Sequence, residues 1–412
     1  MSAWVETDPR RECTFSPARA SHEISMQNDV ESHVRDRYAR AAETTEAALC
    51  CPVTYDPRWL AVLPKEILER DYGCGDPSKH LRAGETVLDL GSGAGKIAYI
   101  ASQVVGPKGR VIGVDVNDVM LALARKHTKS VGDAIGHHNV EFKKGRIQDL
   151  ALDVELLEDH LARHPVRTSE ELAALDTWIA EQKRERPLVA DASIDVVVSN
   201  CVLNLVRADQ KPQLFREIRR VLKRGGRAVI SDITSDESIP AHLAADPELW
   251  SGCISGALRE DEFLRAFEAA GFHGIRILAR DVTPWRVVEG IEFRSLTVEA
   301  FAGKDGPCLE RKQAVVYMGP WKSVTDDDGH TLHRGERMAV CDKTFGLYTR
   351  EPYASSILAI PPREDIPLAG AGPFACRGDA RRDPRETKGA DYVATTDAPP
   401  NGSACAPGSD CC

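Results

Sequence analysis

The sequence predicts an α/β fold: a doubly wound, mostly parallel sheet with an inserted helical segment, followed by a small β-rich C-terminal domain. Two observations carry this prediction. From about residue 83 to residue 280, short apolar runs typical of buried strands alternate with amphipathic stretches of helical period. After residue 284, strand-like segments follow one another between turns, without helical stretches.

A glycine-rich turn follows the first apolar run, residues 87–90. Gly91, Gly93 and Gly95 stand at alternate positions, and a helix is expected over 96–105. Glycine has no Cβ, so each position permits a sharp turn or the close approach of a ligand to the backbone. The helix N-terminus that follows is a favourable place for a polar or anionic ligand.

The second expected strand, 110–114, ends at Asp115, whose carboxylate suits the two hydroxyls of a ribose. The Gly-x-Gly-x-Gly spacing differs from the Gly-x-Gly-x-x-Gly of dinucleotide sites. Together these features resemble the S-adenosylmethionine site of class I methyltransferases, which have a Rossmann-like fold. A nucleotide site for NAD and a purely structural turn are the alternatives. The resemblance implies cofactor contacts from Asp89, Gly91, Ser92, Gly93, Gly95, Asp115 and Val116.

The other elements of the core follow in order. The pattern predicts helices over 119–131, 209–223 and 259–270 and strands over 140–143, 194–199, 227–231 and 275–279. The connection 150–192 is unusually long. It contains two expected helices separated by Pro165, the second with capping-box spacing from Thr168 to Glu171. We interpret it as packing decoration, with a lid over the site as the alternative.

Composition and pattern divide the chain into four parts. Residues 1–27 are polar and irregular, which predicts a flexible arm. A methyltransferase domain is expected over 28–284, beginning with helices over 28–49 and 56–72. A small β-rich domain is expected over 285–361, with strands at 293–302, 313–317, 333–340 and 355–360. Residues 362–412 are rich in Pro, Gly, Ala and Asp, which predicts a disordered tail that carries cysteines.

Charge and hydropathy exclude several classes of protein. The net charge of −10 over 412 residues argues against a nucleic-acid substrate. No apolar run reaches the ~20 residues that a membrane span needs. The N-terminus has no apolar signal region, so we expect a cytoplasmic protein without a membrane or nucleic-acid partner. Twelve cysteines in such a reducing compartment need a reason. No Cys-x-x-Cys pair exists, which argues against a zinc ribbon or a thioredoxin-like motif. A small buried hydrophobe is the simplest role, and it suits Cys308 and Cys341.

Three other cysteines occupy positions that favour chemistry. Cys201 directly follows the strand 194–199, and ligands in such sheets gather at the carboxyl ends of strands. Cys253 and Cys74 each lie between nearby glycines, which permit the close approach of a ligand.

Four motifs, 72–75, 88–93, 199–205 and 252–258, together resemble the arsenite S-adenosylmethionine methyltransferases. The resemblance covers roughly residues 34–361. It implies transfer of methyl groups from S-adenosylmethionine to thiol-bound arsenite and methylarsenite, as in arsenic detoxification. It further implies that Cys201 and Cys253 bind As(III), with Cys74 as a third, redox-active ligand. The resemblance also implies that an N-terminal cysteine partners Cys74, and both Cys50 and Cys51 match that role. For the cofactor, the resemblance adds Ile147 and Gln148 near the adenine and Asn200 near the methyl donor.

The chemistry of arsenic agrees with this resemblance. Trivalent arsenic is a soft centre that prefers thiolates, and it keeps a lone pair that can attack the methyl group of a sulfonium. Orientation then carries much of the catalysis, and no general base is needed. Methyl transfer oxidises arsenic, so a dithiol must return two electrons. A glutathione or thioredoxin system is the expected reductant and co-substrate.

Two other functions are open to the sequence. A class I methyltransferase acting on carbon or oxygen of a quinone or sterol shares the glycine loop but gives the cysteines no role. A thiol-based arsenic-binding protein leaves the glycine loop unexplained. The terminal pair Cys411–Cys412 is a candidate for passing arsenic inward or for a redox reserve, with incidental thiols as the alternative.

Overall fold

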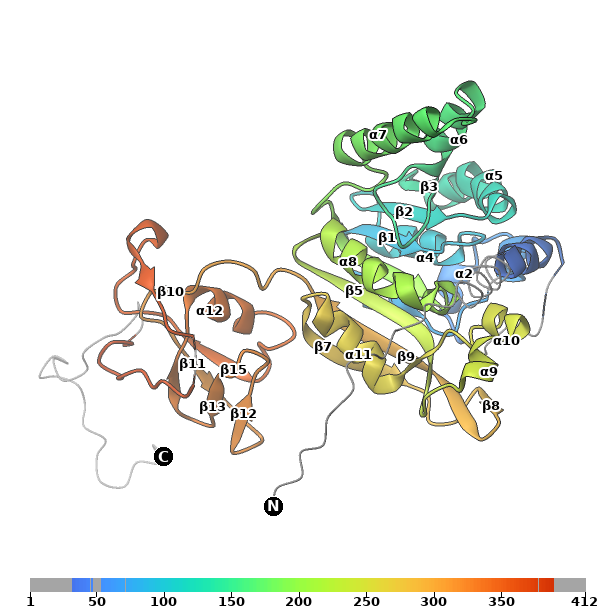
Figure 1. Cartoon of the computed structure of the whole chain (residues 1–412). Helices are drawn as coiled ribbons and strands as arrows, with labels where there is room; N and C mark the ends of the chain where they lie inside the picture. Colours follow the sequence, from blue (N-terminus) through green and yellow to red (C-terminus); the bar gives the residue numbers. More distant parts are fainter. Residues whose placement is uncertain (1–31, 45, 47–52, 71, 377, 389–412) are drawn as a thin grey trace, which may run out of the picture. The chain divides into compact units, whose positions relative to one another are not determined.

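The computed structural model describes residues 32–44, 46, 53–70, 72–376 and 378–388 (Figure 1). The chain divides into two units, Met1–Gly303 and Lys304–Cys412. Among the described residues, no helix is long and apolar enough to cross a membrane. The expected N-terminal arm, Cys50, Cys51 and the Cys411–Cys412 tail lie outside the described residues.

A single large sheet organises the first unit. Its main path runs β3 (Val140–Lys144), β2 (Arg110–Asp115), β1 (Thr86–Leu90), β4 (Ile194–Asn200), β5 (Leu222–Ser235), β9 (Ile291–Phe301) and β7 (His273–Arg280). The first five strands are parallel, and β9 is antiparallel to both β5 and β7. Short strands β6 (Leu258–Arg259) and β8 (Arg286–Val288) pair with β5 and β9. The predicted Rossmann-like fold is confirmed.

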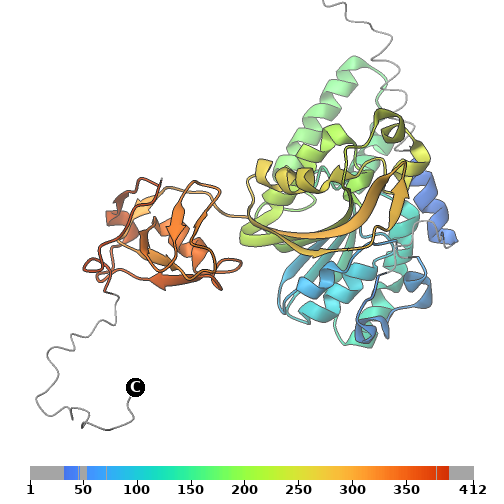
Figure 2. The same ribbon diagram turned by 90° about the horizontal axis from the view of Figure 1, so that it is seen from below.

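Helices cover both faces of this sheet, because successive strand residues point to opposite sides. Val87 packs with α4 (Lys96–Val105) and α5 (Asp118–Ile135), whereas Leu88 packs with α8 (Lys211–Val221) and α11 (Glu260–Ala269). Figure 2 shows these helix pairs on opposite sides of the strands. The two apolar cores leave the carboxyl ends of β1, β2 and β4 free to form a site.

The boundary between the units differs from the expectation. We expected residues 285–303 in the C-terminal domain, but β9 pairs along its length with β5, from Phe301 opposite Arg227 to Phe293 opposite Ser235. Nearly every residue of β9 is buried. A strand whose two faces are both covered belongs to the core of the sheet, so the first unit extends to Gly303.

One predicted helix ends early. We expected residues 209–223 to be helical, with Gly225 and Gly226 as the stop, but α8 ends at Val221. Leu222 is extended and pairs with Ile194, and its buried side chain joins the core. Strand pairing therefore overrides the helical pattern over the last turn.

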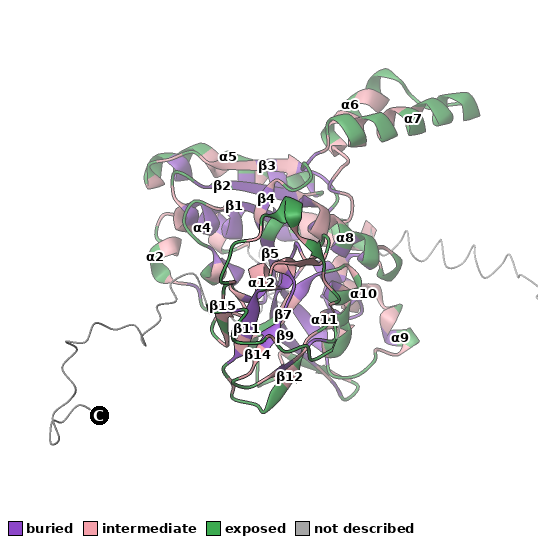
Figure 3. Ribbon diagram, turned by 90° about the vertical axis from the view of Figure 1, so that its left-hand side faces the viewer, coloured by how far each residue is buried: buried purple, intermediate pink, exposed green. Residues whose placement is uncertain are grey.

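The inserted segment forms two helices, α6 (Val154–Arg163) and α7 (Ser169–Glu185), as expected. The capping box between Thr168 and Glu171 is present. Neither helix has a buried residue, and both stand out from the sheet in Figure 3. Residues Ala151 and Leu188 are joined by a backbone hydrogen bond of 3.1 Å, so the insertion begins and ends at one place.

The segment before the sheet is less regular than expected. Residues 32–43 are helical, within the helix expected over 28–49. The helix expected over 56–72 is two single turns, α2 (Pro57–Leu60) and α3 (Lys65–Leu68), with Pro64 at the N-cap of the second. A 3-10 turn, η2 (Pro77–His80), leads to β1.

The second unit is β-rich, as predicted. Strand β11 (Ala314–Tyr317) lies between β14 (Arg337–Ala339) and β15 (Ile357–Ile360), and β12 (Ser323–Thr325) pairs with β13 (Thr331–His333). A short helix, α12 (Asp342–Tyr348), packs on this sheet.

Ordered structure continues beyond residue 361, where we expected a disordered tail. Strand β16 (Gly372–Pro373) pairs with β10 (Leu309–Glu310). Arg382 makes two hydrogen bonds to the carboxylate of Glu310, at 2.7 and 2.8 Å. These contacts attach residues that the composition alone would leave free; the rest of that expected tail, 389–412, lies outside the described residues.

Candidate active site

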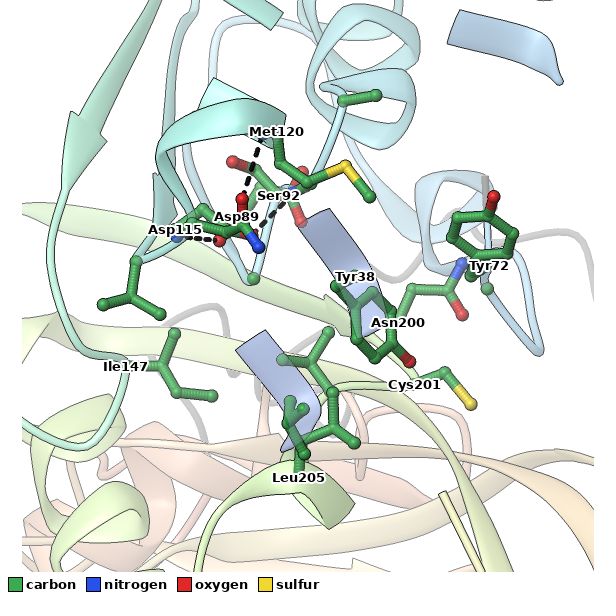
Figure 4. Close-up of a pocket in the computed structure, with 18 of the residues that line it drawn as sticks. Tyr38, Tyr72, Asp89, Ser92, Asp115, Met120, Ile147, Asn200, Cys201 and Leu205 are labelled. Atoms are coloured by element: carbon green, nitrogen blue, oxygen red, sulfur yellow. Dashed lines mark hydrogen bonds between the residues drawn. The ribbon is translucent and has the colours of Figure 1, made fainter. Parts of the chain in front are cut away.

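The glycine loop after β1 is fixed by the carboxylate at the end of β2. Asp115 accepts hydrogen bonds from the backbone N–H of Gly93 at 2.9 Å and of Asn117 at 2.8 Å (Figure 4). Burial raises the pKa of Asp115, and these backbone donors oppose the rise. The carboxylate thus joins loop and strand at the edge of a pocket.

The pocket lies at the carboxyl ends of β1, β2 and β4. All but one of the expected cofactor residues line it, namely Asp89, Gly91, Ser92, Gly93, Asp115, Val116, Ile147, Gln148 and Asn200. A Cβ on Gly93, at φ +51°, would meet nothing within 4 Å and would project into this space. The buried hydroxyl of Ser92 has no hydrogen-bond partner among the described residues. The open space beside Gly93 and the Ser92 hydroxyl that is available to a ligand fit the binding of S-adenosylmethionine.

The other two loop glycines serve packing. A Cβ on Gly91 would lie 2.3 Å from Val202, and one on Gly95 would lie 2.7 Å from the Phe142 ring. Gly95 caps α4 in a left-handed conformation and does not line the pocket. Its expected contact with the cofactor therefore stays a prediction.

The pocket also has lining residues that the sequence did not reveal, among them two tyrosines and a methionine. Tyr38, on the helix 32–43, and Tyr72 line the pocket, with ring centroids 6.1 Å apart in edge contact. Met120 of α5 lies beside them (Figure 4). Val34 and Tyr38 stand at helical spacing within the helix expected over 28–49, and only the fold shows that they line the pocket with the glycine loop. Asn117 fixes the helix there by donating to the backbone oxygen of Arg35 at 3.1 Å.

Two of the expected thiols meet at one end of this pocket. The sulfur atoms of Cys74 and Cys201 and a carboxylate oxygen of Asp232 all lie within 4.8 Å of one another. All three side chains are buried. Cys253 is outside that group of three, but its Sγ donates to the backbone oxygen of Cys201 at 3.3 Å. It also lies 3.9 Å from the Tyr38 hydroxyl.

Asn200 places Cys74 beside Cys201. Its Oδ1 accepts hydrogen bonds from the backbone N–H of Cys74 at 2.9 Å and of Gly75 at 3.0 Å. A Cβ on Gly73 would lie 2.1 Å from the Asn200 amide, and one on Gly75 would lie 2.6 Å from Ser231. The glycines around Cys74 thus let its loop pack onto the ends of β4 and β5.

Cys201 and Cys253 share an uncommon backbone. Both have φ of +63°, the left-handed region that non-glycine residues seldom adopt. Asn204 holds the two loops together by donating to the backbone oxygens of Ile233 at 2.7 Å and Cys253 at 3.1 Å. A Cβ on Gly256 would lie 1.9 Å from the Asn204 oxygen, so only glycine permits this approach. Such strain concentrates at functional sites.

A buried charged pair lies behind the thiols and was also missed from sequence. The Asp232 carboxylate accepts a hydrogen bond from the backbone N–H of Leu203 at 2.8 Å. Lys211 Nζ donates to the backbone oxygen of Leu203 at 2.6 Å. Burial raises the pKa of Asp232 to about 6 and lowers that of Lys211 to about 8. In the sequence, Asp232 directly follows the strand expected over 227–231 and Lys211 lies inside the helix expected over 209–223, and neither position indicates a role in the site.

Comparison with known proteins agrees with this geometry. A family model described as "Methyltransferase domain" matches residues 81–164 and 179–271, and its interruption falls within the α6–α7 insertion. A second model, described as a domain of unknown function, matches residues 304–392. An arsenite methyltransferase from Aquipseudomonas alcaligenes is 31% identical over 333 residues, which cover 76% of this chain and 86% of that protein. The chain belongs to the arsenite methyltransferases.

Further similarities support this membership. The human arsenite methyltransferase is 27% identical over 370 residues, covering 85% of this chain and 88% of that one. The crystal structure of an arsenic(III) S-adenosylmethionine methyltransferase from Chlamydomonas reinhardtii superposes with a TM-score of 0.50 at 27% identity. It covers 79% of this chain and all of that one. This enzyme therefore uses S-adenosylmethionine to methylate arsenite, and the interpretations as a quinone or sterol methyltransferase and as a non-enzymatic arsenic-binding protein are set aside.

Proposed function

We propose that Cys201, Cys253 and Cys74 hold trivalent arsenic at the methyl-donor end of the pocket. The observation that carries this proposal is the meeting of the Cys74 and Cys201 thiols, within 4.8 Å, beside a pocket that Cys201 itself lines. Three As–S bonds form as three As–O bonds of arsenite break. Each thiol proton leaves with a hydroxide as water. Thiols suit this role because arsenic(III) is a soft centre.

Methyl transfer then needs alignment more than acid–base chemistry. Bound S-adenosylmethionine supplies the methyl group, and the arsenic lone pair forms the As–C bond as the S–C bond breaks. Asp115 would hold the ribose hydroxyls, while the backbone around Gly93 leaves space for the cofactor. Tyr38 and Tyr72 line the pocket, and their rings would help to exclude water from the reacting atoms. Such orientation accounts for a large share of a bimolecular barrier.

The reductive step involves residues beyond the arsenic ligands. Methyl transfer takes arsenic from the trivalent to the pentavalent state, and two electrons must return it. We infer that Cys74 supplies them with Cys50 or Cys51, by forming a disulfide. A glutathione or thioredoxin system then reduces that disulfide. Asn200 fixes the Cys74 loop, because its Oδ1 accepts a hydrogen bond from the Cys74 backbone N–H.

Serine variants test the ligand set. Cys201→Ser and Cys253→Ser should each abolish methylation of arsenite and of methylarsenite, since a hydroxyl of similar size is a poor ligand for a soft centre. X-ray absorption at the arsenic edge should show fewer sulfur neighbours. S-adenosylmethionine affinity should stay near that of the wild type, which separates ligand loss from misfolding. Cys13→Ser, a thiol with no proposed role, is the matched control. Full activity of either variant on methylarsenite would remove that cysteine from the ligand set.

The redox partner needs a separate comparison. Methylarsenite has only two exchangeable ligands, so Cys201 and Cys253 suffice to hold it. Cys74→Ser, and the double change Cys50→Ser with Cys51→Ser, should lose methylation of arsenite but keep part of the activity on methylarsenite. Product speciation over time, with glutathione and then with thioredoxin, measures this. Equal loss on both substrates would contradict the division between binding and redox roles.

A further inference from the structure

A second group of thiols lies in the C-terminal unit, outside the methylation site. The sulfur atoms of Cys308, Cys341 and Cys376 all lie within 4.8 Å of one another. Cys341 is fully buried, whereas the other two are partly exposed. From sequence we assigned Cys308 and Cys341 a packing role. Packing alone does not explain three sulfur atoms from three separate segments converging on one point.

The fold holds two of these thiols at one end of a strand pair. Cys308 immediately precedes β10, and Cys376 follows β16, its antiparallel partner. The backbone N–H of Phe374 donates to the oxygen of Cys308 at 2.8 Å, which extends the pairing toward the thiols. Arg382 fixes the neighbouring Glu310 through two hydrogen bonds. Cys308 and Cys376 are therefore brought together by the backbone and not by chance contact of flexible side chains.

Cys341 completes the group from the opposite direction. It lies between β14 and α12, and its sulfur accepts a hydrogen bond from the backbone N–H of Thr344 at 3.4 Å. The Thr344 hydroxyl is also 3.2 Å away. Burial raises the pKa of Cys341, but these hydrogen bonds and those from the neighbouring thiols outweigh it, so that the pKa lies below its ordinary value. These contacts with Thr344 fix the Cys341 sulfur in place beside the other two thiols.

The number of ligands decides which centre the group fits. Two sulfur atoms bound to one centre are separated by at most about 4.6 Å, twice a metal–sulfur bond of about 2.3 Å. The three sulfur atoms lie within 4.8 Å of one another, so small side-chain movements would bring them to bonding distance of one centre. Over the described part of the chain, no fourth His, Cys, Asp or Glu joins this group. Structural zinc takes four ligands, whereas trivalent arsenic is complete with three thiolates and its lone pair.

We propose that Cys308, Cys341 and Cys376 form a second arsenite-binding site, in the unit matched by the domain of unknown function. Three As–S bonds form, three As–O bonds break, and the three thiol protons leave in three molecules of water, with no change of oxidation state. The site prefers arsenite over methylarsenite, which offers only two exchangeable ligands. It gives the enzyme a second place to bind its substrate, on residues other than those of the methylation site. It depends on arsenite being the substrate and not on the roles proposed for Cys74, Cys201 and Cys253.

Binding of arsenite to a simplified full-length chain tests the proposal. The nine other cysteines are changed to serine, so that only these three thiols remain. The reduced protein is incubated with arsenite, separated from free arsenite, and its arsenic content measured. We expect one arsenic per chain with three sulfur neighbours by X-ray absorption. An additional Cys308→Ser or Cys376→Ser should lower the affinity at least tenfold and leave two sulfur neighbours. No retained arsenic, or a two-sulfur site in the parent variant, would overturn the proposal.

Native mass spectrometry of the otherwise wild-type chain covers the case in which the nine-serine variant fails to fold. The double variant Cys308→Ser with Cys376→Ser should bind one arsenic fewer than the wild type. Cys13→Ser, changed in the same way, should lose none through this site. A parallel sample with Zn²⁺ alone addresses the competing metal. Stoichiometric zinc that arsenite does not displace would overturn the assignment, as would equal arsenic content in the double variant and the wild type. Because the nine-serine variant lacks the methylation thiols, its result is independent of the proposed active site.

Discussion

Asp115 is the residue on which the cofactor pocket depends most directly. It ends β2, bonds the glycine loop through the Gly93 amide and lines the pocket. Asp115→Ala should weaken S-adenosylmethionine binding by roughly 10- to 100-fold, since a hydrogen bond to a charged group contributes about 1.5–3 kcal/mol. Gly93→Val should weaken it further, because the side chain would enter the pocket and strain a left-handed residue. Calorimetric titration measures both.

The matched control for Gly93→Val is Gly84→Val. Gly84 has φ of +83°, with nothing within 4 Å of its Cβ position, and it does not line the pocket. It therefore reproduces the backbone strain without filling the cofactor's space. Wild-type affinity in folded Gly93→Val, or equal loss in both variants, would show that this loop does not cradle the cofactor.

One carboxylate, that of Asp326, makes the stability of the second unit depend on pH. Asp326 lies 2.7 Å from His330 Nδ1 and accepts from the Tyr348 hydroxyl. Burial raises the pKa of Asp326, but these hydrogen bonds outweigh burial and lower the pKa to about 2, compared with an ordinary value of 3.8. An acid with a depressed folded-state pKa stabilises the fold when ionised. This contribution is fully present above pH 3.8 and is lost as the pH falls from 3.8 to about 2.

Asp326→Asn should remove this acid-side slope and cost about 1–3 kcal/mol of unfolding free energy at neutral pH, through weakened buried hydrogen bonds. Urea unfolding at pH 2, 3, 4 and 5, read by pulsed hydrogen exchange on peptides from 323–348, measures the effect. Asp327→Asn, an exposed neighbour, is the control. A slope that persists in Asp326→Asn would assign the acid sensitivity to another group.

Single residues also show how far sequence reasoning reaches. Gly93, Asp115 and Cys201 could be predicted because each occupies a fixed place relative to a strand. The pair Lys211 and Asp232 could not, since it forms only when α8 packs behind β5. The sequence suggests that the glycines around Cys74 leave room for a ligand, and the structure gives them a second effect that the sequence does not show. They permit tight packing against Asn200 and Ser231.

Among the elements, α6 and α7 contribute little to the core. Their ion pairs with the rest of the first unit include Lys144 to Glu158 at 2.6 Å and Lys183 to Asp149 at 2.5 Å. Replacing residues 154–185 by a short glycine–serine linker should cost only about 1–3 kcal/mol, the sum of a few surface ion pairs. Cofactor affinity should change less than twofold. The linker is feasible because Ala151 and Leu188 are hydrogen-bonded neighbours.

Calorimetric and stopped-flow measurement of cofactor binding to this deletion distinguishes decoration from a lid. A changed dissociation rate would favour the lid, which was the alternative to packing decoration. The insertion also illustrates a local success of sequence reasoning: the capping box fixed the start of α7 correctly. Pairing across the sheet was harder, because nothing local in residues 291–301 says which sheet they join.

At the scale of the whole molecule, the C-terminal boundary of the first unit, Gly303, determines which truncated chains should fold. Every residue lining the pocket, and all three described thiols of the methylation site, precede Gly303. Backbone hydrogen bonds of 2.9 and 2.8 Å join Gly225 and Gly226 to Ala302, so the sheet continues to that point. A chain cut after Gly303 should therefore bind S-adenosylmethionine within twofold of the full chain.

A chain cut after residue 284, the boundary that the sequence suggested, should instead fail to fold. It lacks β9, which pairs with both β5 and β7 and is buried along nearly its whole length. Its loss exposes the apolar edge of the core and leaves β7 without a partner strand. Unfolding curves and cofactor titration of the two fragments provide the test. A folded, cofactor-binding 1–284 fragment would show that β9 is not part of the essential core. Loss of binding in 1–303 would show instead that the pocket depends on the second unit.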